Sequence, residues 1–143
     1  MRARTFTVGD RYTRSLVEDL TRTRLVQYAG ASGDFNPLHS DERHAREAAG
    51  LPGVFAHGML TMAMTGTLLG DVVGIENVTR FGGRFKAQVW PGDSLSASLS
   101  VTAVSSTPTG AVALELDLRT VNQHGVEVFT ATARAVVDDQ HAP

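Results

Sequence analysis

The residues best suited to chemistry lie in one short segment, residues 28–39. It places the Asp34 carboxylate and the His39 imidazole five residues apart, on a connection interrupted by glycine and proline. An imidazole titrates near neutral pH, and a neighbouring carboxylate can orient it or share a water molecule with it. Such a pair can activate water for addition to a double bond, or remove water in the reverse direction. Because aspartate, asparagine and proline are also common in turns and caps, the segment alone leaves a structural role open.

Asn36 and Pro37 stand between these two candidate residues. The proline ring fixes the φ angle of Pro37 and biases Asn36 toward extended backbone. The Asn36 side chain can then hydrogen-bond across the turn. We therefore expect a stiff loop that holds Asp34 and His39 in place.

A second candidate element is His57-Gly58-Met59, at the expected start of an apolar helix. The first N–H groups of a helix have no partner within it and form the positive end of its dipole, which suits a carbonyl oxygen that gains negative charge. Gly58 has no Cβ to obstruct the approach of that carbonyl. His57 can instead be a capping or core histidine, so its role stays open.

Composition limits the classes of protein that can position these residues. The chain has 143 residues, 42% hydrophobic and 20% charged, which is typical of one domain. Cysteine is absent, which excludes disulfides, thiolate catalysis and cysteine-ligated zinc. A net charge of −2 without a basic block argues against nucleic-acid and anionic-membrane partners. Residues 1–10 lack the apolar run of a signal peptide and no stretch is long enough to span a membrane, so we expect a cytoplasmic protein.

Helices are expected in the first half of the chain. Thr21 can cap a helix over residues 22–31, and Ser40 or Asp41 can cap a shorter one that stops at Gly50. A third helix is expected from His57-Gly58 to about residue 73. Its side chains are apolar around most of its circumference, so it has to be buried.

Strands are expected at the start of the chain and after Gly74. Residues 6–17 look extended, and period-two alternation of apolar and polar residues predicts strands at 94–102, 112–119 and 126–137. Short loops between consecutive strands require antiparallel pairing. A curved sheet with one apolar face and one apolar helix satisfy each other if the sheet wraps the helix. The expected architecture is therefore α+β, a single hot-dog fold.

The chain also resembles a known family. The residues that carry the resemblance are Tyr28, Ser32-Gly33-Asp34-Phe35-Asn36-Pro37-Leu38-His39, Ala45 and His57-Gly58-Met59, with Phe85 and Pro91-Gly92-Asp93 at a family strand and turn. They resemble the (R)-specific enoyl-CoA hydratase signature of MaoC-like dehydratases. The resemblance covers most of the chain and implies one MaoC-like hot-dog domain over residues 1–143.

The resemblance also implies roles for individual residues. Asp34 and His39 are expected to be the acid/base pair that holds the catalytic water, with Asn36 supporting their geometry. The Gly58 N–H is expected to polarise a thioester carbonyl. No metal and no bound cofactor are expected. Some family members carry a serine at the position of Gly66, so the pocket is expected to be roomier there.

Substrate contacts are expected at five positions, which are His57, Met59, Met62, Arg84 and Lys86. Arg80, Arg84 and Lys86 have even spacing and can share one strand face, where they can receive the phosphate of a pantetheine arm or simply be solvated. Met62, Met64 and Leu68 are candidates for setting the acyl chain length, or plain core residues.

The leading functional hypothesis is an (R)-specific enoyl thioester hydratase, a hydro-lyase that acts reversibly as a 3-hydroxyacyl thioester dehydratase. A hot-dog acyl thioesterase is one alternative. Another is a dehydratase subunit that is active only with a partner, because the chain also resembles carrier-protein dehydratase subunits of fatty-acid elongation. Expected partners are an acyl-CoA or acyl-carrier-protein substrate and a second copy in a homodimer, with a heterodimer of related hot-dog subunits as the variant.

Overall fold

The computed structural model describes residues 5–138. The predicted domain over residues 1–143, and the predicted lack of a signal peptide within residues 1–10, therefore include residues outside the described range. The two α-helices are α1 (Arg22–Ser32) and α2 (Gly58–Val73), and the strands are β1 (Arg11–Val17), β2 (Val78–Phe85), β3 (Leu95–Ser106), β4 (Val112–Asn122) and β5 (Glu127–Val137). Three short helical turns complete the described elements, at Pro37–His39, His44–Ala48 and Ile75–Asn77.

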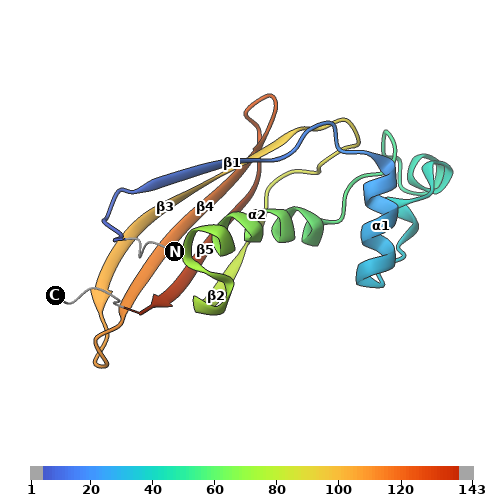
Figure 1. Cartoon of the computed structure of the whole chain (residues 1–143). Coiled ribbons are helices and arrows are strands. Elements are labelled where there is room, and N and C mark those ends of the chain that lie inside the picture. The colour runs from blue at the N-terminus through green and yellow to red at the C-terminus, as the bar shows by residue number, and fades with distance from the viewer. Residues whose placement is uncertain (1–4, 139–143) are drawn as a thin grey trace.

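The five strands form one antiparallel sheet in the order β1-β3-β4-β5-β2. Helix α2 lies along one face of this sheet and contacts β1, β2, β3 and β5. Its amino end points toward α1, which lies beyond the end of the sheet (Figure 1). This arrangement confirms the predicted α+β hot-dog fold.

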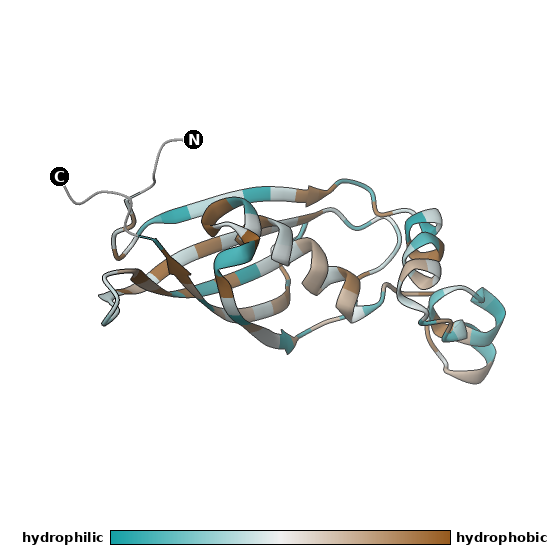
Figure 2. Ribbon diagram, turned by 60° about the horizontal axis from the view of Figure 1, so that its bottom comes forward, coloured by the Kyte–Doolittle hydropathy of each residue, from teal (hydrophilic) through white to brown (hydrophobic). Residues whose placement is uncertain are grey.

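Strand alternation explains which face of the sheet meets α2. In β3, Leu95, Ala97, Leu99 and Val101 are buried, while the serines between them lie on the other face. Figure 2 shows the same alternation of hydrophobic and hydrophilic residues along the strands. The buried members pack with apolar residues of α2 such as Leu68 and Leu69 in one core. The hydrophobic effect on this shared core therefore holds the helix on the sheet.

The predicted helix boundaries are close to the observed ones. The Thr21 side chain accepts a hydrogen bond from the Arg24 N–H, and Gly33 ends α1 with a φ of +73°. Asp41 precedes the short turn at His44–Ala48, and its carboxylate accepts a hydrogen bond from the His44 N–H at 3.1 Å. That turn has π-helical rather than α-helical hydrogen bonding.

The strands differ from the sequence-based expectation in their bounds, since β1 begins at Arg11 rather than at residue 6 and β4 ends at Asn122 rather than at residue 119. Strand β2 has the sequence VTRFGGRF, in which two adjacent glycines interrupt the alternation, so the apolar period does not give the bounds of the strand expected around Arg80, Arg84 and Phe85. Strand β3 continues to Ser106, beyond the expected end at residue 102. Its register against β4 shifts between Val101 and Ala103, which breaks the period-two pattern there. Within residues 5–138, no helix combines the length and hydropathy that crossing a bilayer requires.

Candidate active site

The loop between α1 and the 44–48 turn is held by its own side chains. The Asp34 carboxylate accepts the Asn36 N–H at 3.2 Å, and the Asn36 side-chain oxygen accepts the Leu38 N–H at 3.1 Å. Asn36 has an extended backbone (φ −56°, ψ 123°), as the following proline requires. Asn36 thus caps the helical turn at Pro37–His39, and this turn carries His39 away from solvent. The Asp34 side chain remains at the exposed start of the same loop.

The hydrogen bonding of His39 determines which ring nitrogen is free. The residue is 8% exposed, and its Nδ1 lies 2.6 Å from the carbonyl oxygen of Phe55. Because a carbonyl oxygen only accepts, Nδ1 carries the proton in this contact. The neutral ring then keeps its lone pair on Nε2, so Nε2 is available as a base.

His57 lies behind this loop and contacts both candidate catalytic residues. It is 2% exposed, and its Nε2–H donates to the Asp34 backbone carbonyl at 3.0 Å. Its ring stacks on that of His39 with centroids 3.8 Å apart, and the Tyr28 ring meets its edge at 4.9 Å. Its side chain makes no capping hydrogen bond to α2. Of the two structural alternatives, a capping or a core histidine, His57 is therefore a core histidine. The buried Nδ1 of His57 has no hydrogen-bond partner among residues 5–138.

The fold therefore brings three chemically capable groups together. Asp34, His39 and His57 each offer one potential ligand atom, and these atoms lie within 4.8 Å of one another. The two imidazole planes are only 26° apart, so their lone pairs run side by side rather than toward one point. Each ring also uses one nitrogen for a backbone carbonyl. This geometry suits the sharing of a water molecule or a proton better than the binding of a metal ion.

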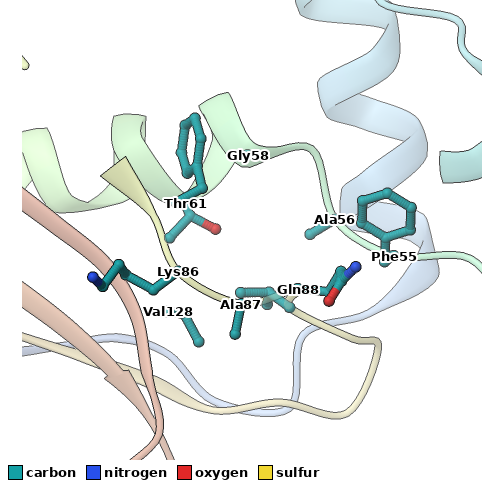
Figure 3. Close-up of a pocket in the computed structure, with 10 residues that line it drawn as sticks. Phe55, Ala56, Gly58, Thr61, Lys86, Ala87, Gln88 and Val128 are labelled. Atoms are coloured by element: carbon teal, nitrogen blue, oxygen red, sulfur yellow. The ribbon is translucent and has the colours of Figure 1, made fainter. Parts of the chain in front are cut away.

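The amino end of α2 opens onto a cavity of about 350 Å³. The cavity is lined by Phe55, Ala56, Gly58, Thr61, Phe85, Lys86, Ala87, Gln88, Val89 and Val128. Figure 3 shows Gly58 and Thr61 on the helix side, with the Lys86 ammonium at the end away from Phe55. The first hydrogen bond here is donated by Leu60 to the His57 carbonyl, so the N–H groups of Gly58 and Met59 precede the hydrogen-bonded turns. An anion or a polarised carbonyl is favoured at such a position.

A larger groove, of about 1520 Å³, follows the exposed face of α2. Met59, Met62 and Gly66 line it, and Met59 is 55% exposed. Two other residues proposed to set acyl length are placed differently: Leu68 is buried, and Met64, which packs against the core as Met62 does, does not line the groove. Beside Gly66, the buried Thr65 hydroxyl donates to the Thr61 carbonyl and bonds with Thr120.

The three basic residues near β2 do not share one environment. Arg80 and Arg84 lie on the outer face of the strand, because their neighbours Phe81 and Phe85 pair with buried residues of β5. Lys86 follows the strand end and lines the cavity beside Gly58, and Arg84 does not line it. The structure therefore brings Lys86, and not Arg84, to the cavity.

Two parts of the site were not found by sequence reasoning. The Phe55 carbonyl, which orients His39, is a backbone group and leaves no signal in residue type. Phe85, which lines the cavity, was noted only as part of a family strand. Its position opposite Gly58 depends on the pairing of β2 with β5 and not on local sequence.

The Glu42 carboxylate lies outside the site and links α1 to the segment before His57. Glu42 accepts hydrogen bonds from the Arg22 side chain at 2.6 Å and from the Val54 N–H at 3.2 Å. The Arg22 hydrogen bond is the main reason why the pKa of Glu42 lies below its ordinary value of 4.5, and the charge of Arg46 adds to this lowering. Glu42 thereby connects α1 to the segment that leads into His57.

Comparisons with known proteins identify the family of this chain and proteins that share its fold. The model of the MaoC like domain matches residues 5–122. The 3-hydroxyacyl-thioester dehydratase Y of Mycobacterium tuberculosis is 32% identical over 133 residues, which are 91% of this chain and 42% of that protein. The peroxisomal enoyl-CoA hydratase 2 of Arabidopsis thaliana is 30% identical over 94 residues, which are 62% of this chain and 29% of that protein. The chain thus spans less than half the length of the curated relatives that it matches.

Solved structures resemble the chain over nearly its whole length. An (R)-hydratase from A. caviae superposes with a TM-score of 0.79 at 28% identity, covering 92% of this chain and 97% of that one. A MaoC-like dehydratase from Rhodospirillum rubrum superposes with a TM-score of 0.80 at 25% identity, covering 96% of each chain. Because the MaoC like domain model matches residues 5–122 and the fold superposes on these structures, the chain belongs to the MaoC-like dehydratase family.

Proposed function

We propose that the chain catalyses the reversible, (R)-specific addition of water to a trans-2-enoyl thioester, forming a 3-hydroxyacyl thioester. The observation that carries this proposal is the convergence of Asp34, His39 and His57, with potential ligand atoms within 4.8 Å, next to the free N–H groups that begin α2. Hydration of a conjugated thioester needs these two parts: a group that handles the proton of water, and a donor for the carbonyl oxygen.

The acid/base step belongs to Asp34 and His39. The Asp34 carboxylate and the Nε2 lone pair of His39 hold one water molecule between them. As the water oxygen bonds to C3 of the enoyl group, its proton passes to this pair. The pair then returns a proton to C2 on the same face, so the addition is syn and the pair is regenerated. Asn36 supports the step by fixing the loop through its bond to Leu38.

Gly58 serves the carbonyl end of the substrate. Negative charge develops on the thioester oxygen when water adds to C3, and the Gly58 N–H stabilises it together with the dipole of α2. His57, enclosed at 2% exposure, acts here through Asp34 and His39. Direct substrate contact falls instead to the cavity and groove on either side of Gly58.

The two hollows suit the two ends of a thioester substrate. The groove is apolar around Met59 and Met62, has the polar residues Asp71, Glu76 and Asn77 toward the carboxyl end of α2, and is large enough for an acyl chain. The smaller cavity has Lys86 at one end, and Lys86 can receive a phosphate of the pantetheine arm, with the exposed Arg84 nearby on the strand. This placement is compatible with both coenzyme A and an acyl carrier protein as the carrier.

The direct test is hydration of crotonyl-CoA by the purified chain. The proposal expects a decrease in ultraviolet absorbance of the conjugated thioester, formation of the (R)-3-hydroxy product and no release of free thiol. Release of free thiol without hydration identifies the thioesterase alternative. Activity that requires an added second hot-dog subunit identifies the partner-dependent alternative.

We further propose that the working form is a cytoplasmic homodimer. Strand β2 is at the edge of the sheet, where unpaired backbone groups favour joining to another strand. The large apolar side chain of Ile75, just before this strand, is 70% exposed. Light scattering at micromolar concentration is expected to give twice the chain mass, and a monomer contradicts the proposal. If the chain instead forms a heterodimer, light scattering in the presence of a related hot-dog subunit gives the combined mass of the two chains.

A further inference from the structure

Two phenylalanines of β2 lie opposite two glycines of α2. A Cβ added at Gly58 would lie 3.1–3.2 Å from three atoms at the far end of the Phe85 ring. A Cβ added at Gly66 would lie 3.3 Å from the Phe81 ring. The Gly58 pair is at the amino end of the helix and is the closer of the two, because the next Phe81 atom is 3.9 Å from the Cβ added at Gly66.

The Phe85 ring is supported from behind. It stacks on the ring of Phe129, with centroids 5.2 Å apart and planes 29° apart. Phe129 is fully buried, and Gly83 makes room for it, because a Cβ there would lie 2.7 Å from the Phe129 ring and 2.2 Å from the Thr130 carbonyl oxygen. The Phe85 ring therefore cannot move back from Gly58 into the core.

Phe85 also borders the cavity. It is 51% exposed and lines the cavity together with Gly58 and Lys86. A phenylalanine used only for packing is usually buried. Phe85 is thus fixed on one side by Phe129 and available on the other side to the space where Gly58 presents its N–H.

We propose that Phe85 is a positioning residue that sets the place of the Gly58 N–H at the amino end of α2. The inference rests on the proposed function, in which this N–H stabilises the thioester oxygen. It also gives a different reason for the glycine: a side chain at residue 58 crowds the Phe85 ring and displaces it, rather than obstructing the approach of the substrate carbonyl.

The first experiment compares Phe85→Leu with Phe81→Leu. Both variants shorten a β2 phenylalanine that contacts Phe129 and faces an α2 glycine. With crotonyl-CoA, Phe85→Leu is expected to lower kcat on the order of 10- to 100-fold with a smaller change in KM, because displacement of a reacting group by about 1 Å costs roughly that much. Phe81→Leu is expected to lower kcat much less, with a similar decrease in Tm.

The second experiment adds Gly58→Ala to the unsubstituted chain and to the Phe85→Leu variant, which gives four proteins to compare. The alanine methyl group lies 3.1–3.2 Å from the Phe85 ring, so the ring has to shift by a few tenths of an ångström, whereas the smaller leucine relieves this contact. The double variant Gly58→Ala/Phe85→Leu is therefore expected to be more active than Gly58→Ala alone. Thermal melts of the same four proteins report the contact independently of activity, and Gly58→Ala is expected to lower Tm less in the Phe85→Leu background.

The outcomes separate the inference from the proposed function. Equal loss of kcat in Phe85→Leu and Phe81→Leu, or a double variant no more active than Gly58→Ala, overturns the role of Phe85 while hydration by the unsubstituted chain still stands. An unsubstituted chain that hydrates no enoyl thioester overturns the proposed function, and the positioning role falls with it. In that case the Tm comparison shows only the packing contact.

Discussion

His39 and His57 lie with their rings stacked, 3.8 Å between centroids and 26° between planes. His57 also donates to the Asp34 carbonyl, so one buried side chain contacts both residues of the proposed acid/base pair. The stack uses the face of the His57 ring, whereas the hydrogen bond uses its Nε2. They can therefore be separated by substitution.

We expect His57→Phe and His57→Gln to fail in different ways. Phenylalanine retains a buried ring against His39 but removes the hydrogen bond to Asp34, so kcat is expected to fall on the order of tenfold or more through misplacement of the loop. Glutamine retains a donor but loses the ring, so a larger decrease in Tm is expected. Steady-state kinetics and circular dichroism melts distinguish the two. Normal kcat in His57→Phe contradicts the importance of the Asp34 contact.

Substitution of the proposed pair tests the chemical step. Asp34→Asn and His39→Gln roughly preserve volume and hydrogen bonding, and each is expected to lower kcat for crotonyl-CoA by about 10²- to 10⁴-fold with a much smaller change in KM. Because both groups act on one water molecule, the double variant is expected to be little worse than the poorer single variant.

The control for this pair is His44→Gln. His44 is an exposed histidine five residues after His39, on the turn at His44–Ala48, and its substitution is expected to leave kcat unchanged. Near-normal hydration by folded Asp34→Asn or His39→Gln contradicts the assignment and leaves these residues with a turn-forming role alone.

The fold was predictable where apolar periodicity is continuous, as in α2 and β3. It was less predictable at β2, because Gly82 and Gly83 contribute no side chain to the alternation and the strand is recognised only through its pairing with β5. The site shows the same division. Asp34, His39 and Gly58 were predicted as candidates from residue type and resemblance. Lys86 lines the cavity and Arg84 does not. This difference depends on where β2 ends, and the spacing of the basic residues does not predict that end.

Glu42 gives a prediction about pH. Its pKa is below the ordinary value of 4.5 in the folded protein, chiefly through the Arg22 hydrogen bond, so its contribution to stability is present above about pH 4.5 and is lost as pH falls through the folded-state pKa. Glu42→Gln is expected to lower Tm at pH 7 and to flatten the loss of Tm on acidification. Melts between neutral and acidic pH measure both effects.

The control for Glu42 is Glu47→Gln, because Glu47 pairs only with exposed Arg43 among the described residues. Asp10, whose pKa is lowered by hydrogen bonds from the N–H and hydroxyl of Thr7, contributes acid sensitivity that both variants retain. Equal acid slopes in the two variants contradict the role of Glu42.

Lys86 gives a prediction about the carrier end of the substrate. Lys86→Gln is expected to raise KM for crotonyl-CoA with little change in kcat, because a phosphate contact remote from C3 binds the ground state and the transition state alike. A crotonyl thioester of N-acetylcysteamine, which has no phosphate, is expected to show no such change. Arg80→Gln, at an exposed cation on β2 that does not line the cavity, is the control. Equal effects on both substrates contradict a phosphate contact.

Met62 gives the last prediction, on acyl chain length. Its side chain lines the groove along α2, so Met62→Trp is expected to fill the groove and Met62→Ala to widen it. Tryptophan is expected to lower kcat/KM for long-chain enoyl thioesters about tenfold or more relative to the four-carbon substrate, in the range that apolar pockets achieve. Met64→Ala is the control, because Met64 packs against the core and does not line the groove. Its effect is expected on Tm and equally on both substrates. If the two Met62 variants change kcat/KM by the same factor for short and long substrates, the groove along α2 does not hold the acyl chain.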